Sequence, residues 1–277
     1  MNLEPGISRQ TRTLVISEQG SHGAFFGISV LLFIVSAVVT VRWCNSMSAM
    51  RGMPMPGGWT MSMAWMRMPG QTWVGATTSF VGMWVVMMVT MMLPSLAPTL
   101  WRCHQSVGRA RETLRGRPTT LVGLGYFFVW TLFGLAVFPV GVAAAAIEME
   151  QPALARAVPV AAGFVVLVAG ALQFTKWKAH HLACCREAPE PDCALPTHAG
   201  AAWRLGLHFG AHCGLSCANL TAILLVFGVM DLRAMALVTA AITTERLAPA
   251  EERIARDIGA VVVGAGLFLI VRAARLG

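Results

Sequence analysis

The sequence predicts an all-α protein, a polytopic transmembrane bundle of six or seven helices. Hydrophobic residues make up 56% of its 277 residues and charged residues only 12%, against roughly 25% charged in soluble domains. The mean hydropathy is +0.64. The hydrophobic residues fall in blocks of about 18 to 25, long enough to cross a bilayer core of about 30 Å. This composition excludes a cytosolic enzyme and a disordered chain.

Seven apolar segments lie along the chain, and the sixth of them is short. Each is continuously apolar, whereas a membrane β-barrel would show alternating strands of about ten residues. The last three segments could also form two spans and an interfacial helix, which leaves the count at six or seven. The segments are Gly23–Val41, Trp73–Leu93, Thr120–Ala146, Ala157–Phe174, Leu205–Val229, Leu232–Thr244 and Ile258–Val271.

The distribution of Lys and Arg predicts the orientation. With the N-terminus inside, fourteen of these residues fall on the inner side and seven on the outer side, as the positive-inside rule requires. The net charge of +8 then marks cytoplasmic loops beside a lipid bilayer, and we expect no nucleic-acid partner. Residues 1–22 are expected to be a cytoplasmic tail and 23–41 an uncleaved anchor helix. Residues 42–72 would form an extracytoplasmic Met-rich loop, and 73–277 a metal-binding transmembrane domain.

Sulfur divides between the two sides of this topology. Thirteen of the 17 methionines lie in the outer loop or the second apolar segment, whereas every cysteine except Cys44 lies inside or in the fifth segment. Thioether and thiolate ligands select Cu(I); Met survives where thiols oxidise, and the cytosol keeps Cys reduced. A Met in a helix is often packing, but the loop methionines have no core to fill, so we expect them to capture metal. The methionines of the outer loop are Met47, Met50, Met53, Met55, Met61, Met63, Met66 and Met68. Those of the second apolar segment are Met83, Met87, Met88, Met91 and Met92. The inner cysteines are Cys103, Cys184, Cys185 and Cys193.

The fifth segment carries a His pair and a Cys pair. His208 and His212 share one helix face, and polar groups inside a membrane are functional by default; buried, hydrogen-bonded core histidines are the alternative. Cys213 and Cys217 lie roughly 100° to 180° away, so each pair needs ligands from another helix. At a similar depth, the second segment offers the stripe Met83, Met87 and Met91. A small-residue stripe for close helix packing consists of Gly206, Gly210 and Gly214.

The inner segment after residue 175 contains further metal-binding side chains. His180, His181, Cys184 and Cys185 could form a delivery or exit site, or belong to a solvated loop beside the membrane. The segment has no C-x-x-C pair, which argues against a zinc finger or a thioredoxin motif. Farther along, Glu245 and Arg246 are expected to pair with each other.

Four stretches together resemble a bacterial family of predicted metal-binding integral membrane proteins, a domain of unknown function of which some members are labelled copper chaperone. They are residues 83–95 (MWVVMMVTMMLPS), 173–178 (QFTKWK), 212–217 (HCGLSC) and 228–232 (GVMDL). The likeness runs from about Trp73 to Ile270 and implies a bacterial inner-membrane protein. It also implies adjacent cysteines at the end of the third motif, where Ser216 here precedes Cys217. The positions it implies for metal binding are Met87, Met88, Met91, Met92, His212, Cys213 and Cys217.

Together these features predict a non-enzymatic protein that handles Cu(I), either a passive transporter or a chaperone that passes copper to a client protein. The chain lacks a phosphate-binding G-x-x-x-x-G-K-[ST] loop, so neither a nucleotide nor an ATP-driven pump is expected. A membrane redox protein that uses haem or thiols is the second hypothesis. His208 and His212, one turn apart, could not bracket one haem, and no C-x-x-C-H motif is present. A structural subunit of a membrane complex is the third.

Overall fold

The structure is a computed structural model that describes residues 5–50, 52–106, 116–186, 198–249 and 251–276. The inner thiol Cys193 lies outside these residues, and the side chain of Cys103 lies outside the described part as well. The described chain is almost entirely helical, which confirms the predicted fold class. Its elements are α1 (Pro5–Ala49), β1 (Met53–Met55), β2 (Trp59–Met61), the 3₁₀ helix η1 (Met63–Trp65), α2 (Trp73–Ser106), α3 (Gly116–Glu150), α4 (Pro152–Leu172), α5 (Lys176–Arg186), α6 (Ala199–Phe227), α7 (Leu232–Leu247) and α8 (Glu251–Leu276).

Six helices in the described residues are long and apolar enough to cross a membrane. The sixth apolar segment of the sequence forms α7, which has 16 residues. At 1.5 Å per residue it is about 24 Å long, shorter than a bilayer core of about 30 Å. The candidate spans are Gly23–Ala49, Trp73–Arg102, Arg117–Glu150, Pro152–Leu172, Ala199–Phe227 and Glu252–Arg275.

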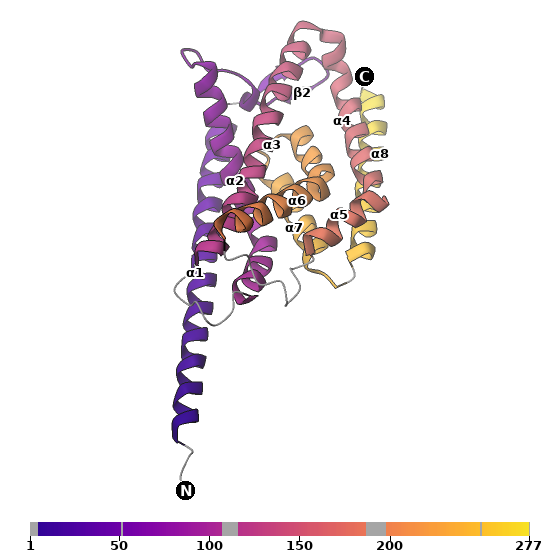
Figure 1. Cartoon of the computed structure of the whole chain (residues 1–277). Helices are drawn as coiled ribbons and strands as arrows, with labels where there is room; N and C mark the ends of the chain where they lie inside the picture. Colours follow the sequence, from indigo (N-terminus) through magenta and orange to yellow (C-terminus); the bar gives the residue numbers. More distant parts are fainter. Residues whose placement is uncertain (1–4, 51, 107–115, 187–197, 250, 277) are drawn as a thin grey trace.

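Helices α2 and α6 form the centre of the bundle. In each, 56% of the apolar window is buried, against 11–28% in the other four candidate spans. Helix α6 packs against α3, α4, α5 and α7, while α1 packs along α2 and α8 along α4. Figure 1 shows α1 on one side of the bundle, α4 and α8 on the other, and α6 between them. The outer helices expose apolar side chains, as expected for a surface that faces lipid.

Three glycines bring α6 close to α3. A Cβ atom on Gly206 or Gly210 would meet the backbone of α3 at Val122 or Tyr126, and one on Gly214 would meet an aromatic ring of α3. The predicted small-residue stripe is therefore a close helix contact. Its partner is α3, whereas the methionines of α2 approach α6 from another side.

The Met-rich segment 42–72 is folded rather than an open loop. Helix α1 continues into it, so Met47 is helical, and β1 and β2 pair as an antiparallel hairpin. Met55 and Met61 are buried in a small core against α3 and α4, and the indole of Trp59 donates a 2.8 Å hydrogen bond to a carbonyl of α4. The expectation that the loop methionines have no core to fill is wrong for these two, because the hairpin folds onto the ends of two helices.

A sharp turn joins α6 to α7 at the same end of the molecule. Gly228 ends α6 with a φ of 113°, a conformation that favours glycine. The carboxylate of Asp231 caps α7 by accepting hydrogen bonds of 2.8 Å from the backbone N–H groups of Arg233 and Ala234. The turn places Met230 beside the hairpin, and α7 runs back toward α5.

Candidate metal centre

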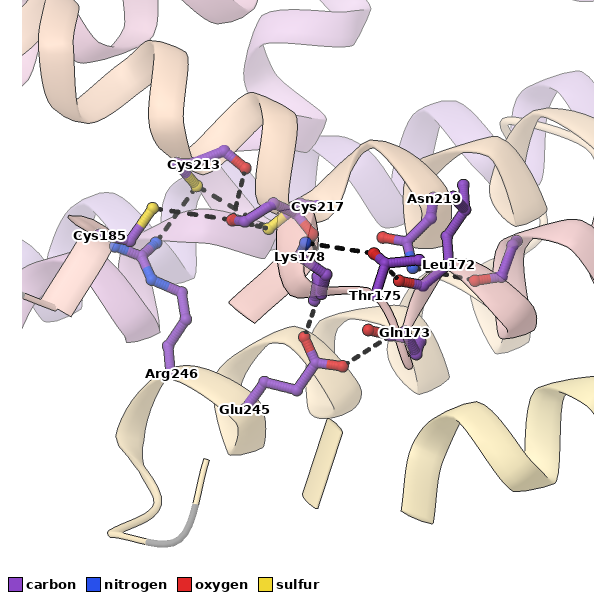
Figure 2. A network of polar contacts seen from close by, with 12 residues as sticks. Leu172, Gln173, Thr175, Lys178, Cys185, Cys213, Cys217, Asn219, Glu245 and Arg246 are labelled. Carbon is purple, nitrogen blue, oxygen red and sulfur yellow. Dashed lines mark hydrogen bonds and ion pairs between the residues drawn. The ribbon is translucent and has the colours of Figure 1, made fainter. Parts of the chain in front are cut away.

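A buried group of sulfur atoms lies where α2, α5 and α6 meet. The sulfur of Cys213 is 3.9 Å from that of Cys217 and 4.0 Å from that of Met92, and all three side chains are at most 1% exposed. Cys185 of α5 is buried as well, and its sulfur is 3.7 Å from the Ser216 hydroxyl. We call Met92, Cys185, Cys213 and Cys217 the thiol cluster; Figure 2 shows its three cysteines.

One buried cation faces the thiol cluster. The guanidinium of Arg246, in α7, donates hydrogen bonds to the Cys213 sulfur at 3.3 Å and to the Ser95 hydroxyl at 3.0 Å. The Tyr126 hydroxyl lies 3.5 Å from the guanidinium and 2.9 Å from the Cys213 sulfur. A buried cation requires a nearby negative charge. The guanidinium faces the Cys213 sulfur, where it can balance a negative charge.

A second buried cation holds the backbone between the two cysteines of α6. Lys178 of α5 donates to the carbonyl oxygen of Ser216 at 2.5 Å and forms a 2.8 Å salt bridge with Glu245, whose other oxygen accepts a 2.7 Å hydrogen bond from Gln173. The expected pairing of Glu245 with Arg246 is wrong. Figure 2 shows that Glu245 points to Lys178, whereas Arg246 points to the thiol cluster.

One face of helix α5 is buried against α6. Lys178, Leu182 and Cys185 are buried, at spacings of four and three residues that mark one helix face. This face packs against α6, so the alternative of a solvated loop is wrong for residues 176–186. A hydrogen bond with Cys213 lowers the pKa of Cys185 below its usual value despite burial.

The histidines form a second cluster on a neighbouring face of α5 and α6. The Nδ1 atoms of His181 and His212 are 2.9 Å apart, and the Nε2 atoms of His208 and His212 are 3.1 Å apart. The ring of His180 lies 5.3 Å from that of His181, and its Nε2 is 3.9 Å from the sulfur of Cys184. Burial and the neighbouring His180 lower the pKa of His181, which favours the neutral imidazole that binds metals. We call His180, His181, His208 and His212 the histidine cluster.

The two clusters are distinct, as the angular spacing along α6 predicts. His208 is exposed, and His181 and His212 are half-buried, in contrast to the thiol cluster. The histidines are thus hydrogen-bonded to one another but are not the fully buried core residues of the alternative interpretation. Because His212 and Cys213 are consecutive, the two clusters lie back to back on α6.

The five methionines predicted on α2 are all buried, with exposures of 0–8%. The expected contact between α2 and α6 is present, but Met92 makes it, and Met92 lies one residue beyond the predicted stripe that ends at Met91. Ser95, three residues after Met92, contacts Arg246 from the same side. The face of α2 toward the thiol cluster is therefore rotated by about 100° from the predicted one.

In the described part of the chain, no three His, Cys, Asp or Glu side chains are grouped so that they could hold a metal ion. A soft-metal site at the thiol cluster therefore has to include the thioether of Met92 beside Cys213 and Cys217. Two thiolates and a thioether are a donor set that suits Cu(I).

Sequence reasoning missed three residues that surround the thiol cluster: Tyr126, Lys178 and Arg246. Both cations are among the fourteen Lys and Arg counted on the inner side, where the positive-inside rule places them outside the membrane-spanning core. The spacing of Lys178 to Leu182 and Cys185 would have shown that Lys178 shares a face with two apolar or weakly polar residues. No comparable signal marks Tyr126, although it is the single Tyr of the sequence.

A family model described as copper chaperone, PpoB2, matches residues 81–269. This range begins in α2 and ends in α8, so it contains both the thiol cluster and the histidine cluster. Neither a curated protein nor a solved structure matches the chain.

Proposed function

Because the chain belongs to the copper chaperone family, we propose that it binds Cu(I) in the membrane at the thiol cluster and passes it through the histidine cluster to a client protein. The proposed location is the bacterial inner membrane, with the N-terminus inside. Helix α5, the start of α6 and the end of α7 would then lie toward the cytoplasm. The observation that carries the proposal is the arrangement of three buried sulfur atoms from α2 and α6.

The distances between these sulfur atoms suit one metal ion. A metal–thiolate bond is about 2.3 Å long, so three sulfur ligands around an ion in one plane stand about 4 Å apart. The separations of 3.9 Å from Cys213 to Cys217 and 4.0 Å from Cys213 to Met92 agree with this value. Cys213 therefore stands at a suitable distance from both Cys217 and Met92 for the three side chains to bind Cu(I).

The charge of the surroundings supports a monovalent ion. Two thiolates and Cu(I) carry a net charge of minus one, which the guanidinium of Arg246 neutralises at 3.3 Å from Cys213. A divalent ion such as Zn²⁺ would leave a net positive charge in a buried site, which is costly. We therefore expect the thiol cluster to prefer Cu(I) over Zn²⁺.

The histidine cluster supports a role in release. Its imidazoles are partly exposed and come from the same two helices as the thiols, so an ion that leaves the thiol cluster meets them next. Exposed imidazoles can exchange a metal with an incoming client more readily than buried thiolates. In contrast, His208 and His212 lie on one face and contact each other, so they cannot bind opposite sides of a haem.

The methionines of α2 favour passive transport as a second candidate function. Met83, Met87, Met88 and Met91 extend the buried sulfur atoms from Met92 toward the hairpin, over about 14 Å of helix. Cu(I) could move between such weak ligands without a nucleotide. Transport and transfer to a client would both use the thiol cluster as the binding site.

The test compares copper binding by the full chain and by a variant with Cys213→Ser and Cys217→Ser, purified in detergent under reducing, anaerobic conditions. We expect the variant to lose one equivalent of tightly bound Cu(I) in competition with a chromogenic chelator. Cys184→Ser, which changes a thiol of α5 outside the thiol cluster, is the matched control and should keep the full stoichiometry. Unchanged copper binding in a folded double variant would refute the proposed site.

A further inference from the structure

We propose a second soft-metal site at the hairpin end of the molecule, built on Cys44 and Met230, where a monovalent soft cation such as Cu(I) first binds. The binding of a cation at this site is inferred from the contacts of Cys44 and Met230 alone. Its role in copper uptake rests on the proposed function. Cys44 and Met47 precede the residues that the family model matches, so membership of the family does not account for them.

The core of this site is a contact between two sulfur atoms from distant parts of the chain. The thiol of Cys44, in α1, lies 3.6 Å from the thioether sulfur of Met230, in the turn between α6 and α7. Cys44 is 1% exposed. Met47 follows Cys44 by three residues, so both lie on the same side of α1. A thiol and a thioether in contact form the beginning of a soft-metal site.

A cavity gives an ion access to this pair. It has a volume of about 770 Å³ and lies between the hairpin, α3, α4 and the turn after α6. Met230 lines it and also contacts the thiol of Cys44. Three further methionines, Met47, Met61 and Met63, line the same cavity. An ion in the cavity therefore meets methionine sulfur before it reaches the thiol.

The charged groups of the cavity favour a cation. Glu148 of α3 and Asp231 of the turn both line it, and none of its described lining residues is Lys or Arg. Asp231 directly follows Met230 and is fixed as the cap of α7. The carboxylates would attract cations into the cavity, and the sulfur atoms would select the soft ones among them.

Packing alone would not require this arrangement. Met235, also near the start of α7, is buried in the apolar core, and no described sulfur contact involves it. Met230 instead places its sulfur against the only cysteine of the first 100 residues. Met235 thus provides a matched control, because it is a methionine on the same part of the chain without a thiol partner.

The experiment measures bound Ag(I), a redox-inert probe for Cu(I), on the full chain in detergent by elemental analysis after desalting. We expect Met230→Leu, which conserves side-chain volume, and Met230→Leu with Cys44→Ala to lose one equivalent relative to the unchanged protein. Met235→Leu should lose none. The variant with Cys213→Ser and Cys217→Ser should lose a different equivalent, so that all four substitutions together lose two.

The outcomes separate this site from the thiol cluster. If the Met230 variants keep all their silver while the Cys213 and Cys217 variant loses one equivalent, the second site is wrong and the proposed function stands. If only the Met230 variants lose silver, the second site stands and the thiol cluster is not a metal site. If Met235→Leu loses as much silver as Met230→Leu, the loss reflects packing and the second site is refuted.

Discussion

The thiol cluster and the histidine cluster occupy neighbouring faces of the same two helices but differ in their surroundings. The cysteines and Met92 are at most 1% exposed, and Cys213 contacts Arg246. The histidines are partly exposed and hydrogen-bond mainly with one another. A buried, charge-compensated site holds an ion tightly, while a partly exposed one exchanges it. Under the proposed function, α5 and α6 would store the metal at the thiol cluster and release it at the histidine cluster beside it.

The largest expected effect tests the buried side of this comparison. Lys178→Met removes the amine from its 2.8 Å salt bridge with buried Glu245, so we expect the free energy of unfolding to fall by about 3–5 kcal/mol. Thermal unfolding in detergent measures this. Lys176→Met, on the exposed side of the same helix, should change little, and adding Glu245→Leu to Lys178→Met should restore most of the loss. Equal effects of the two lysine variants would contradict the salt bridge.

The next effect concerns the charge of the thiol cluster. Without the guanidinium, a bound Cu(I) with two thiolates would be an uncompensated buried anion, so Arg246→Met should weaken Cu(I) binding by roughly 100-fold, or about 2.7 kcal/mol. Chelator competition measures the affinity. Arg233→Met, at an exposed position of the same helix, serves as control. A variant that binds Cu(I) as tightly as the unchanged protein would show that Arg246 does not balance the site.

Adding a thiol should strengthen the buried site. Ser216 lies 3.6 Å from the Cys217 sulfur and 3.7 Å from the Cys185 sulfur, and Ser216→Cys would create the adjacent cysteines that the family resemblance implies. We expect Cu(I) affinity to rise by about tenfold, or about 1.4 kcal/mol. Ala218→Cys, on the exposed face of α6, should not raise it. A similar gain from both variants would indicate nonspecific thiol binding.

The smallest effect tests the exposed side. His208→Ala removes one of four imidazoles and leaves the thiol cluster intact, so Cu(I) affinity should stay unchanged while transfer to an external chelator slows by about threefold, or under 1 kcal/mol of barrier. Stopped-flow mixing measures the rate. His198→Ala, at the start of α6 and outside the cluster, should transfer copper at the normal rate. A loss of affinity in His208→Ala would mean that the two clusters form one site.

Much of the fold follows from local properties of the sequence. The lengths of the apolar segments predict the spans, since a membrane requires about 20 apolar residues, and the rotation per residue separates His212 from Cys213 correctly. The positions of Lys178 and Arg246 could not be predicted in this way. Hydropathy assigns a cation to a loop, whereas the structure buries both because partners from other helices, Glu245 and the thiols, are available.

The same reasoning explains the errors in the Met-rich segment and on α2. Whether Met55 has a core to fill depends on α3 and α4, which lie far away in the sequence. The choice between Met91 and Met92 depends on the rotation of α2 about its axis, which tertiary contacts such as that of Ser95 with Arg246 determine. The family resemblance implied both Met91 and Met92. The structure shows that Met92 is the one in contact with Cys213.

The salt bridge of Lys178 has a mechanical consequence. Helix α5 is 11 residues long, yet it carries a residue of each cluster and the amine that donates to the carbonyl of Ser216. Any movement of α5 away from α6 would withdraw His181, Lys178 and Cys185 together. It would also break the hydrogen bond of Lys178 to Ser216, which lies in the helix turn between Cys213 and Cys217. A protein that docks on α5 would thus change the contacts around an ion in the thiol cluster without reaching the ion itself.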